Sequence, residues 1–233
     1  MKAAIMQPYF MPYIGYFQLI KAVDKFIIYD DVNYIKQGWI NRNSILVQNR
    51  SYMFSLPLKD ASSFKKINEI ELNEMLFPKW KIKFFKTIEA YKKAPHYYIV
   101  RQLLEKIFHM NEGRINDLIY QSLVEISEYL DMKTIIERSS IVYKNSELSG
   151  AERLIDICRC ENADVYINPL GGQELYNKNY FSEHHIKLYF IKANPVEYKQ
   201  FNNVFIPWLS IIDVMMFNSP EEINIMLDNF ELL

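Results

Sequence analysis

The sequence is poor in three features that often mark a specialised class of protein. Its 233 residues include only 6 glycines and 2 cysteines, and the formal net charge is −1. Scarce glycine leaves little flexible linker, so each glycine that occurs indicates a turn or a close backbone approach. A near-neutral charge argues against bulk nucleic-acid binding, which needs a strong basic field. A local site for one anion stays open.

Long apolar runs are also absent. None approaches the roughly 18 to 20 residues that cross a bilayer, and the chain reaches Gln7 and Pro8 before any secretory apolar stretch could form. We therefore expect a soluble protein that is not exported and has no transmembrane segment. Cys158 and Cys160 lie two positions apart in a predicted helix, where side chains diverge, so we expect neither a disulfide nor a shared metal ion.

Familiar catalytic motifs are missing as well. The chain has neither the Gly-x-Ser-x-Gly motif of α/β-hydrolases nor the Gly-x-x-x-x-Gly-Lys-Ser/Thr motif of P-loop enzymes. Its 4 histidines show no spacing typical of a zinc site. These absences disfavour three common kinds of enzyme.

The composition that remains is globular with an aromatic excess. Hydrophobic residues make up 50% of the chain, charged residues 24% and aromatic residues 15%, including 17 tyrosines. A chain of this length fits one domain. The aromatic excess is as consistent with a homodimer surface as with a sugar-binding site.

Strand and helix patterns alternate in the first and last parts of the chain. Apolar runs predict strands at 3–7, 24–31, 134–138, 164–168 and 186–191. Helical patterns lie at 14–22, 150–160 and 172–184. Because this alternation indicates parallel strands with covered faces, we predict an α/β fold with a mostly parallel sheet flanked by helices.

The middle and the end of the chain have other patterns. Segments 51–58 and 66–73 alternate as two antiparallel strands do. Helical periodicity at 76–94, 96–110 and 114–132 predicts a mainly helical insertion over about 74–131 within a single domain spanning 1–233. Two further helices are predicted at 207–218 and 219–230, the second capped by Ser219 with Glu222.

Binding chemistry concentrates in the stretch YDDVNYIKQGWINRN, residues 29–43, directly after the second predicted strand. Ligands of open α/β sheets collect at such strand ends. Lys36 and Arg42 can neutralise a phosphate or a carboxylate. Tyr34 and Trp39 can stack on a base or a sugar, and Asn41 can fix hydroxyl groups. We interpret the stretch as a polar-ligand loop rather than a solvated hairpin tip.

Asp30 and Asp31 in this loop have three possible roles. They could hold a divalent ion that bridges a pyrophosphate, act as a base on an amine or hydroxyl, or pair with Arg42. Adjacent side chains of a strand face opposite sides, so we expect only one of the two to enter the site.

Two weaker clusters follow later strands. Ser139 and Ser140 can contact phosphate or cap the next element. Gly171 and Gly172 stand before a predicted helix, where backbone N–H groups can approach an anion, although Gly-Gly is also an ordinary turn.

Several of these blocks together resemble the WbqC-like protein family. The likeness runs from Ala3 to about Asn218 through MQPYFMPYIGYFQLI, FIIYDDVNYIKQGWINRN, YKKAP, GAERLIDIC, VYINPLGGQELY, YKQF and FIPWLSIIDVMMFN. The first two blocks are long and rich in unusual residues, which makes the resemblance specific. It implies functional roles for Gln7, Tyr9, Gly15, Asp30, Asp31, Lys36, Trp39, Asn41, Arg42, Gly171, Gly172, Tyr176, Gln200, Ser210 and Asp213.

The resemblance implies a bacterial cytoplasmic protein associated with O-antigen or other surface-polysaccharide biosynthesis. It implies action on sugars or sugar nucleotides, such as attachment of glycine to an amino sugar. The opening strand, turn, helix and second strand are also similar in layout to nucleotidylyltransferase-like enzymes. The His-x-Gly-His pair of those enzymes is absent from YIGYFQ, so only the nucleotide-binding scaffold carries over.

Our leading hypothesis is an N-acyl or aminoacyl transferase that modifies an amino sugar on a nucleotide carrier. Asp30 or Asp31 would act as the base, Asn41 or a backbone N–H as the oxyanion donor, and Lys36 with Arg42 as the pyrophosphate clamp. The sequence identifies no cofactor, and the donor could be an acyl thioester, an aminoacyl-tRNA or a free amino acid with ATP. The alternatives are a non-catalytic sugar-nucleotide or carrier-binding protein and a metal-dependent glycosyltransferase.

Overall fold

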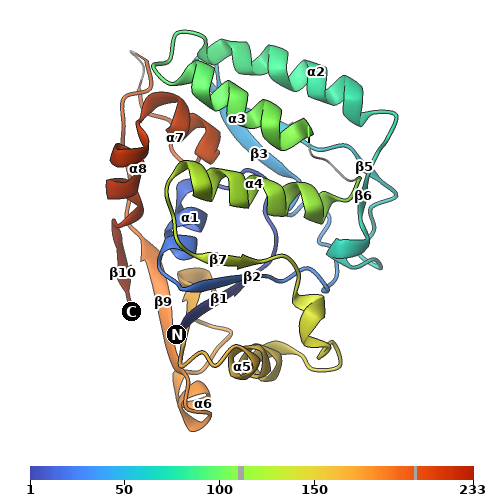
Figure 1. The fold of residues 1–233 in the computed structure, drawn as a ribbon, viewed down its shortest axis with the longest axis vertical. Helices are drawn as coiled ribbons and strands as arrows, with labels where there is room; N and C mark the ends of the chain where they lie inside the picture. Colours follow the sequence, from blue (N-terminus) through green and yellow to red (C-terminus); the bar gives the residue numbers. More distant parts are fainter. Residues whose placement is uncertain (110–112, 202–203) are drawn as a thin grey trace.

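The computed structural model describes residues 1–109, 113–201 and 204–233, and its centre is a six-stranded sheet. The strands are β1 (Lys2–Met6), β2 (Lys25–Ile28), β7 (Ile135–Glu137), β8 (Val165–Pro169), β9 (Lys187–Ala193) and β10 (Phe230–Leu232). Their order is β10-β9-β8-β1-β2-β7, and only the pair β9 and β10 is antiparallel (Figure 1). This confirms the predicted α/β fold with a mostly parallel sheet and a Rossmann-like layout.

Helices cover both faces of this sheet (Figure 1). One face packs against α1 (Ile14–Lys21), α4 (Ile115–Tyr129), α7 (Ile211–Phe217) and α8 (Pro220–Leu227), and the other against α5 (Gly150–Cys160) and α6 (Lys178–Glu183). Phe26 and Ile28 of β2 join the first core, whereas Ile27 between them joins the second. Burial on both sides explains why these strands have continuous apolar sequences.

Two helices and a hairpin extend the first core away from the sheet. The hairpin joins β3 (Arg42–Val47) to β4 (Arg50–Ser55), and the helices are α2 (Phe77–Ile88) and α3 (Tyr97–His109). Trp80 of α2 stacks on Phe84 with a centroid distance of 5.0 Å, and Phe54 of the hairpin lies 5.3 Å from Phe84. Phe10, from the loop after β1, meets Phe54 at 6.0 Å. This aromatic cluster holds the loop after β1 against the helices.

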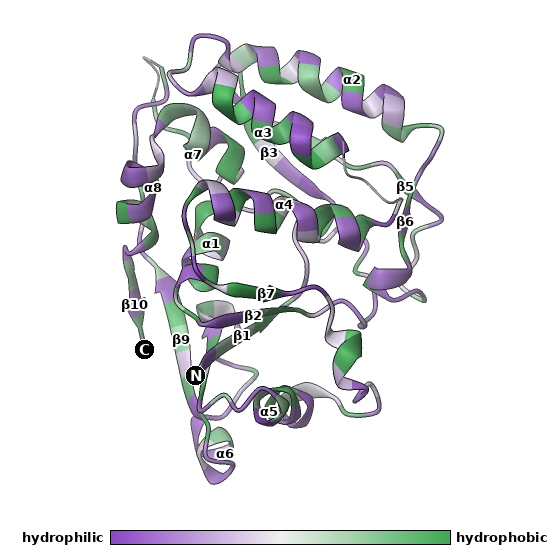
Figure 2. Ribbon diagram, viewed as in Figure 1, coloured by the Kyte–Doolittle hydropathy of each residue, from purple (hydrophilic) through white to green (hydrophobic). Residues whose placement is uncertain are grey.

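Helices α2, α3 and α4 are amphipathic, with hydrophobic and hydrophilic turns intermixed along each (Figure 2). Their buried residues, such as Phe84, Leu104 and Ile119, belong to the same core as α1 and α7. Across the described residues, no helix combines the length and apolarity needed to span a membrane.

Several element boundaries differ from the sequence prediction. The sequence predicted one helix over 172–184. In the structure a 3-10 helix, η4 (Leu170–Gly172), ends where that helix was expected to start. The α-helix α6 begins only at Lys178, because the Asn177 side chain caps it by accepting from Asn179 N and Tyr180 N. Segment 219–230 ends its helix at Leu227 and continues into the edge strand β10. The helix expected at 207–218 begins at Ile211, and the one at 76–94 ends at Ile88 before a 3-10 turn, η2 (Glu89–Tyr91).

The region after β2 differs most. Residues 42–47 form β3, which pairs with β4, although the sequence suggested pairing of 51–58 with 66–73. Those two segments meet through the short strands β5 (Leu58–Lys59) and β6 (Glu71–Leu72) and through a hydrogen bond from Asn73 N to Pro57 O. A 3-10 helix, η1 (Ile67–Glu69), precedes β6. The helix predicted at 96–110 matches α3 to His109, and its last residue lies outside the described residues.

Candidate functional site

Two pockets receive residues from the segment between β2 and β3, the stretch that the sequence marked for ligand binding. The first, which we call the polar pocket, has a volume of about 740 Å³ and lies beyond the ends of β2 and β7. The second, the aromatic pocket, has a volume of about 530 Å³ and lies beyond the ends of β1 and β8. Both are at the carboxyl edge of the parallel strands, where ligands of open α/β sheets bind.

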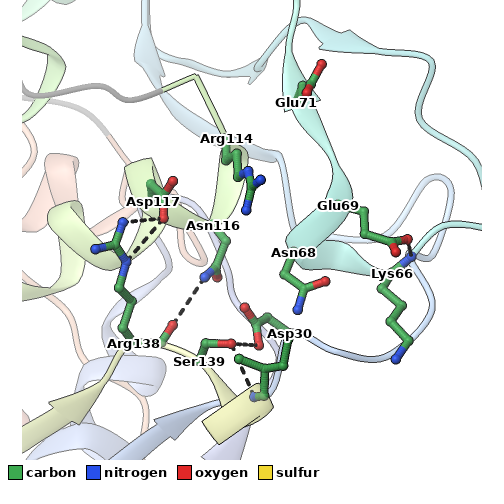
Figure 3. Close-up of a pocket in the computed structure, with 11 residues that line it drawn as sticks. Asp30, Lys66, Asn68, Glu69, Glu71, Arg114, Asn116, Asp117, Arg138 and Ser139 are labelled. Atoms are coloured by element: carbon green, nitrogen blue, oxygen red, sulfur yellow. Dashed lines mark hydrogen bonds and ion pairs between the residues drawn. The ribbon is translucent and has the colours of Figure 1, made fainter. Parts of the chain in front are cut away.

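Four separate segments build the polar pocket. Figure 3 shows side chains from the end of β2, from η1 and β6, from the start of α4, and from the end of β7 converging on one hollow. The lining residues are Asp30, Lys66, Asn68, Glu69, Glu71, Arg114, Asn116, Asp117, Arg138, Ser139 and Ile141. Nearly all are polar or charged, so the pocket suits a hydrophilic ligand.

Asp30 lies at the floor of the polar pocket with one oxygen engaged and the other unpaired. Its Oδ1 accepts hydrogen bonds from Ser139 Oγ at 2.6 Å and from Ser140 N at 3.1 Å. Its Oδ2 is buried and has no hydrogen-bond partner among the described residues. Burial raises the pKa of Asp30, and the Asp31 charge adds to that effect, while the bonds from the two serines oppose it. The unpaired oxygen is therefore a proton acceptor of increased basicity.

Asp31 has a different environment. Its side chain forms an ion pair with Arg153 of α5, and only 3% of each side chain is exposed. Ser140 Oγ also donates to Asp31, and the Arg153 guanidinium lies 4.8 Å from the centre of the Tyr29 ring. As expected, only one carboxylate of the pair lines a pocket, and it is Asp30.

The positive charges of the polar pocket are only partly neutralised. Arg138 donates to Asp117 at 2.6 Å. Arg114 and Lys66 have no ion pair or side-chain hydrogen bond with any described residue, and the Arg114 guanidinium points into the hollow in Figure 3. These two cations can receive an anionic group of a ligand.

The aromatic pocket collects five residues predicted to bind substrate: Gln7, Tyr9, Gly15, Trp39 and Gly171. It adds Tyr13 and Trp208, which were not predicted. Four rings form a continuous row, Trp39 to Tyr9 to Tyr13 to Trp208, with centroid distances of 6.2, 6.5 and 5.9 Å. The terminal tryptophans are 52% and 72% exposed, which is high for so large an apolar side chain and typical of a ligand platform.

The loop that carries Tyr9 and Tyr13 is held by hydrogen bonds from distant segments. Met11, at φ 46°, offers its carbonyl oxygen to Ser210 Oγ at 2.7 Å and to Asn43 Nδ2 at 2.5 Å. Pro12 O accepts from Ile211 N at 2.7 Å. Ser210, predicted as a binding residue, thus caps α7 and anchors the pocket loop from beneath.

Two glycines are required by close packing. A Cβ at Gly15 would lie 2.3 Å from Cε2 of the Tyr13 ring, and a Cβ at Gly172 would lie 1.9 Å from Asn168 Nδ2. Gly171 is exposed and forms part of the wall of the aromatic pocket. The anion site that we expected where Gly171 and Gly172 lead into a helix is not formed, because η4 does not continue into α6.

The remaining loop residues lie outside both pockets. Asn41 uses its amide fully, since Nδ2 donates to Leu56 O at 3.1 Å and Oδ1 accepts from Tyr34 at 3.0 Å. Arg42 lies 5.2 Å over the Trp39 ring and donates to the Gln37 carbonyl. Lys36 is exposed. Arg42 contacts the Trp39 ring directly, and Asn41 with Tyr34 holds the neighbouring chain.

Asp213 and Gln200 form a buried network rather than a pocket lining. The Asp213 carboxylate accepts from Tyr91 at 2.5 Å, from Tyr198 at 2.6 Å and from Gln200 Nε2 at 2.7 Å. Burial raises the pKa of Asp213, against these three bonds. The network ties α7 to the segment after β9, which borders the aromatic pocket. Tyr176 packs edge-on against Phe181, away from both hollows.

Sequence reasoning missed the residues that complete each pocket. Lys66, Asn68, Arg114 and Asn116 belong to segments predicted as a strand and a helix, and nothing in their local pattern indicated a ligand. Trp208 could have been noticed as an exposed aromatic between a proline and a helix. Among residues 1–109, 113–201 and 204–233, no three histidine, cysteine or carboxylate side chains converge as metal ligands do.

Comparison with known proteins gives the same family as the sequence motifs. The model of the WbqC-like protein family matches residues 7–225. The chain is 30% identical over 223 residues to a Mycobacterium tuberculosis protein named "Uncharacterized protein Rv1507c", with 92% of each chain covered. No solved structure matches significantly. The family match spans most of the chain, and we conclude that this protein belongs to the WbqC-like protein family.

Proposed function

We propose that this protein transfers an acyl or aminoacyl group, such as glycyl, to the amine of a nucleotide-linked amino sugar in the bacterial cytoplasm. The reaction would serve surface-polysaccharide biosynthesis. The observation that carries the proposal is Asp30, whose unpaired Oδ2 lies at the floor of the polar pocket. A carboxylate with a raised pKa is suited to remove a proton near neutral pH.

The chemistry needs that base because an amino sugar arrives as an ammonium ion. Asp30 takes one proton, and the freed nitrogen lone pair attacks the carbonyl carbon of an activated donor. The amide C–N bond forms and the bond from that carbon to the leaving sulfur or oxygen breaks. The leaving atom keeps the electron pair and receives the second amine proton. Ser139 and Ser140 hold Oδ1, which keeps Oδ2 directed at the amine.

The rest of the polar pocket supplies the other requirements of acyl transfer. Asn68 lines the pocket, and its side-chain amide makes no hydrogen bond to the described residues. That side chain can donate to the developing oxyanion. This is the role we expected of Asn41, whose amide is already engaged. Arg114 and Lys66 line the pocket, whereas Arg42 and Lys36 do not, and we assign the contact with the sugar phosphate to the first two.

The aromatic pocket supports the choice of a nucleotide carrier. Exposed tryptophan and tyrosine rings stack on bases and sugars alike. Burial raises the pKa of Tyr9 and of Tyr13, so both stay neutral phenols that can also donate hydrogen bonds. The segment between β2 and β3 contributes residues to both pockets.

One observation disfavours the glycosyltransferase alternative. That reaction would use Asp30 and Asp31 jointly to hold a divalent ion. Asp31 is already neutralised by the buried Arg153 guanidinium, whose charge would also repel a metal ion at that position.

A thermal-shift panel comes first, with dTDP-, UDP-, GDP- and CMP-linked sugars, ATP and acyl-CoA. A ligand at a hundred times its dissociation constant adds about 2.7 kcal/mol to the free energy of unfolding. We expect one nucleotide family to raise the melting temperature and the Trp39→Ala variant to lose that response, whereas Lys36→Ala keeps it. No response to any nucleotide sugar would contradict the carrier assignment.

Transfer itself is then measured by mass spectrometry of amide product from the matching amino sugar and candidate donors. Asp30→Asn should form no product, and Lys36→Ala should form as much as the natural protein. Full turnover by Asp30→Asn would contradict the base assignment. Binding of the nucleotide sugar without product from any donor would favour a carrier-binding protein instead.

A further inference from the structure

The floor of the polar pocket contains two oxygen acceptors without a donor among the described residues. They are Asp30 Oδ2 and Asn116 Oδ1. The exposed fraction of the two side chains is 0% and 4%. An unpaired buried acceptor costs about 1–3 kcal/mol, and buried polar groups in native proteins are nearly always paired. Two such atoms on one pocket floor therefore point to a ligand that donates to both.

The orientation of Asn116 is determined by its other contact. Asn116 Nδ2 donates to the Arg138 carbonyl oxygen at 3.1 Å (Figure 3). A carbonyl oxygen only accepts, so exchanging the amide nitrogen and oxygen would place two acceptors against each other. The oxygen of Asn116 is thus the atom left for a ligand, on the same floor as Asp30 Oδ2.

The number of donors favours an ammonium group over a hydroxyl group as the ligand. A hydroxyl group has one hydrogen to donate and satisfies one of the two oxygens, whereas a primary ammonium has three. Asp30 is itself a carboxylate, and its negative charge favours a cation beside the unpaired Oδ2. The described residues hold no group of three histidine, cysteine or carboxylate side chains that could bind a metal ion.

We propose that Asp30 Oδ2 and Asn116 Oδ1 together bind the primary ammonium of the acceptor substrate, with Asn116 as the residue that selects an amine over a hydroxyl. The ammonium displaces the side chains that cover the floor and donates one hydrogen bond to each oxygen. This inference rests on the proposed amine acylation, because it names the residue that recognises the reacting group. Asn116 touches the substrate nitrogen without exchanging a proton with it.

The test measures selectivity rather than turnover. Binding of D-glucosamine and of D-glucose to the full-length protein is followed by calorimetry at a pH where the sugar amine is protonated. We expect the natural protein to bind glucosamine at least about tenfold more tightly, which corresponds to about 1.4 kcal/mol. Asn116→Leu should lose this preference. Asn179→Leu, a change to the same residue at an exposed asparagine of α6 that lines neither pocket, should keep it.

Every outcome decides the inference. Equal binding of the two sugars by the natural protein would overturn it, as would an unchanged preference in Asn116→Leu. A rise in melting temperature with Mg²⁺ or Ca²⁺ but not with glucosamine would assign the two oxygens to a metal ion and also overturn it. If Asn116→Leu does not fold, Asn116→Ala, which also removes the amide oxygen, should lose the preference, and a retained preference contradicts us.

These results are separable from the proposed function. Selective glucosamine binding with no amide product from any donor leaves this inference standing and the transfer reaction wrong. Amide formation by a protein that shows no preference for the amine leaves the reaction standing and this inference wrong.

Discussion

Replacing Asp30 by asparagine should stabilise the protein at neutral pH while removing the proposed transfer activity. The carboxylate is fully buried, and its Oδ2 has no donor among the described residues. The introduced amide keeps the oxygen that Ser139 and Ser140 contact and removes the buried charge. A shift of one pKa unit corresponds to about 1.4 kcal/mol between the charged and neutral forms. At about 2–4 °C per kcal/mol for a chain of this size, removing about 1 kcal/mol of the charge's cost predicts a melting temperature about 2–4 °C higher.

The gain should depend on pH with a definite sign. The folded-state pKa of Asp30 is raised above the ordinary value of 3.8, mainly by burial. Between those two values the native state binds more protons than the unfolded state, so the natural protein loses stability as the pH rises through this window. Asp30→Asn does not titrate. The difference in stability between the variant and the natural protein should therefore grow as the pH rises through this window and become constant above the folded-state pKa.

Asp31→Asn provides the matched control, because the same chemical change one residue later should have the opposite effect. It leaves the buried Arg153 guanidinium without its counter-charge, a loss of about 3–5 kcal/mol. Thermal melts of both variants between acidic and neutral pH make the comparison. A lower melting temperature for Asp30→Asn at neutral pH, or a gain that ignores pH, would refute the reasoning.

Three further predictions concern the aromatic pocket and its support. Gly15→Ala should displace the Tyr13 ring, since the added Cβ would lie 2.3 Å from its Cε2 atom. Calorimetry should then show the affinity for the nucleotide falling roughly tenfold, or about 1.4 kcal/mol. Unchanged affinity would argue against a ligand at Tyr13. Trp208→Gly removes an exposed ring held at φ 64°, so we expect weaker nucleotide binding with no loss of thermal stability, because glycine adopts that conformation readily. Tyr198→Phe deprives the buried Asp213 of a 2.6 Å hydrogen bond, and urea denaturation should show a loss of about 1–3 kcal/mol in the free energy of unfolding. This loss should be larger at neutral than at acidic pH, where Asp213 is protonated. An equal loss at both pH values would count against a charged Asp213.

Local patterns were enough to predict most elements of the sheet. Phe26, Ile27 and Ile28 are buried on both sides, so their uninterrupted apolar run indicated a covered parallel strand before any partner was known. The errors occurred where a short-range interaction competes with a long-range one. Phe230 sits in an edge strand of three residues whose pairing with Ala193 depends on a strand far back in the chain. Asn177 caps the start of a helix that is shorter than the one predicted over 172–184.

The candidate site divides in the same way. The amino-acid sequence by itself determined that polar and aromatic residues gather after the first two strands, at the ends of apolar runs, and from this we predicted a binding site there. Only the tertiary structure decided that Asp30 faces a pocket while Asp31 is held by Arg153, 122 positions away. It also brought Asn116 to the same floor, from the start of a helix whose sequence predicts only packing. Side-chain roles of this kind depend on contacts between residues that are far apart in the sequence and meet only in the folded protein. A local sequence pattern does not show which of these residues will meet.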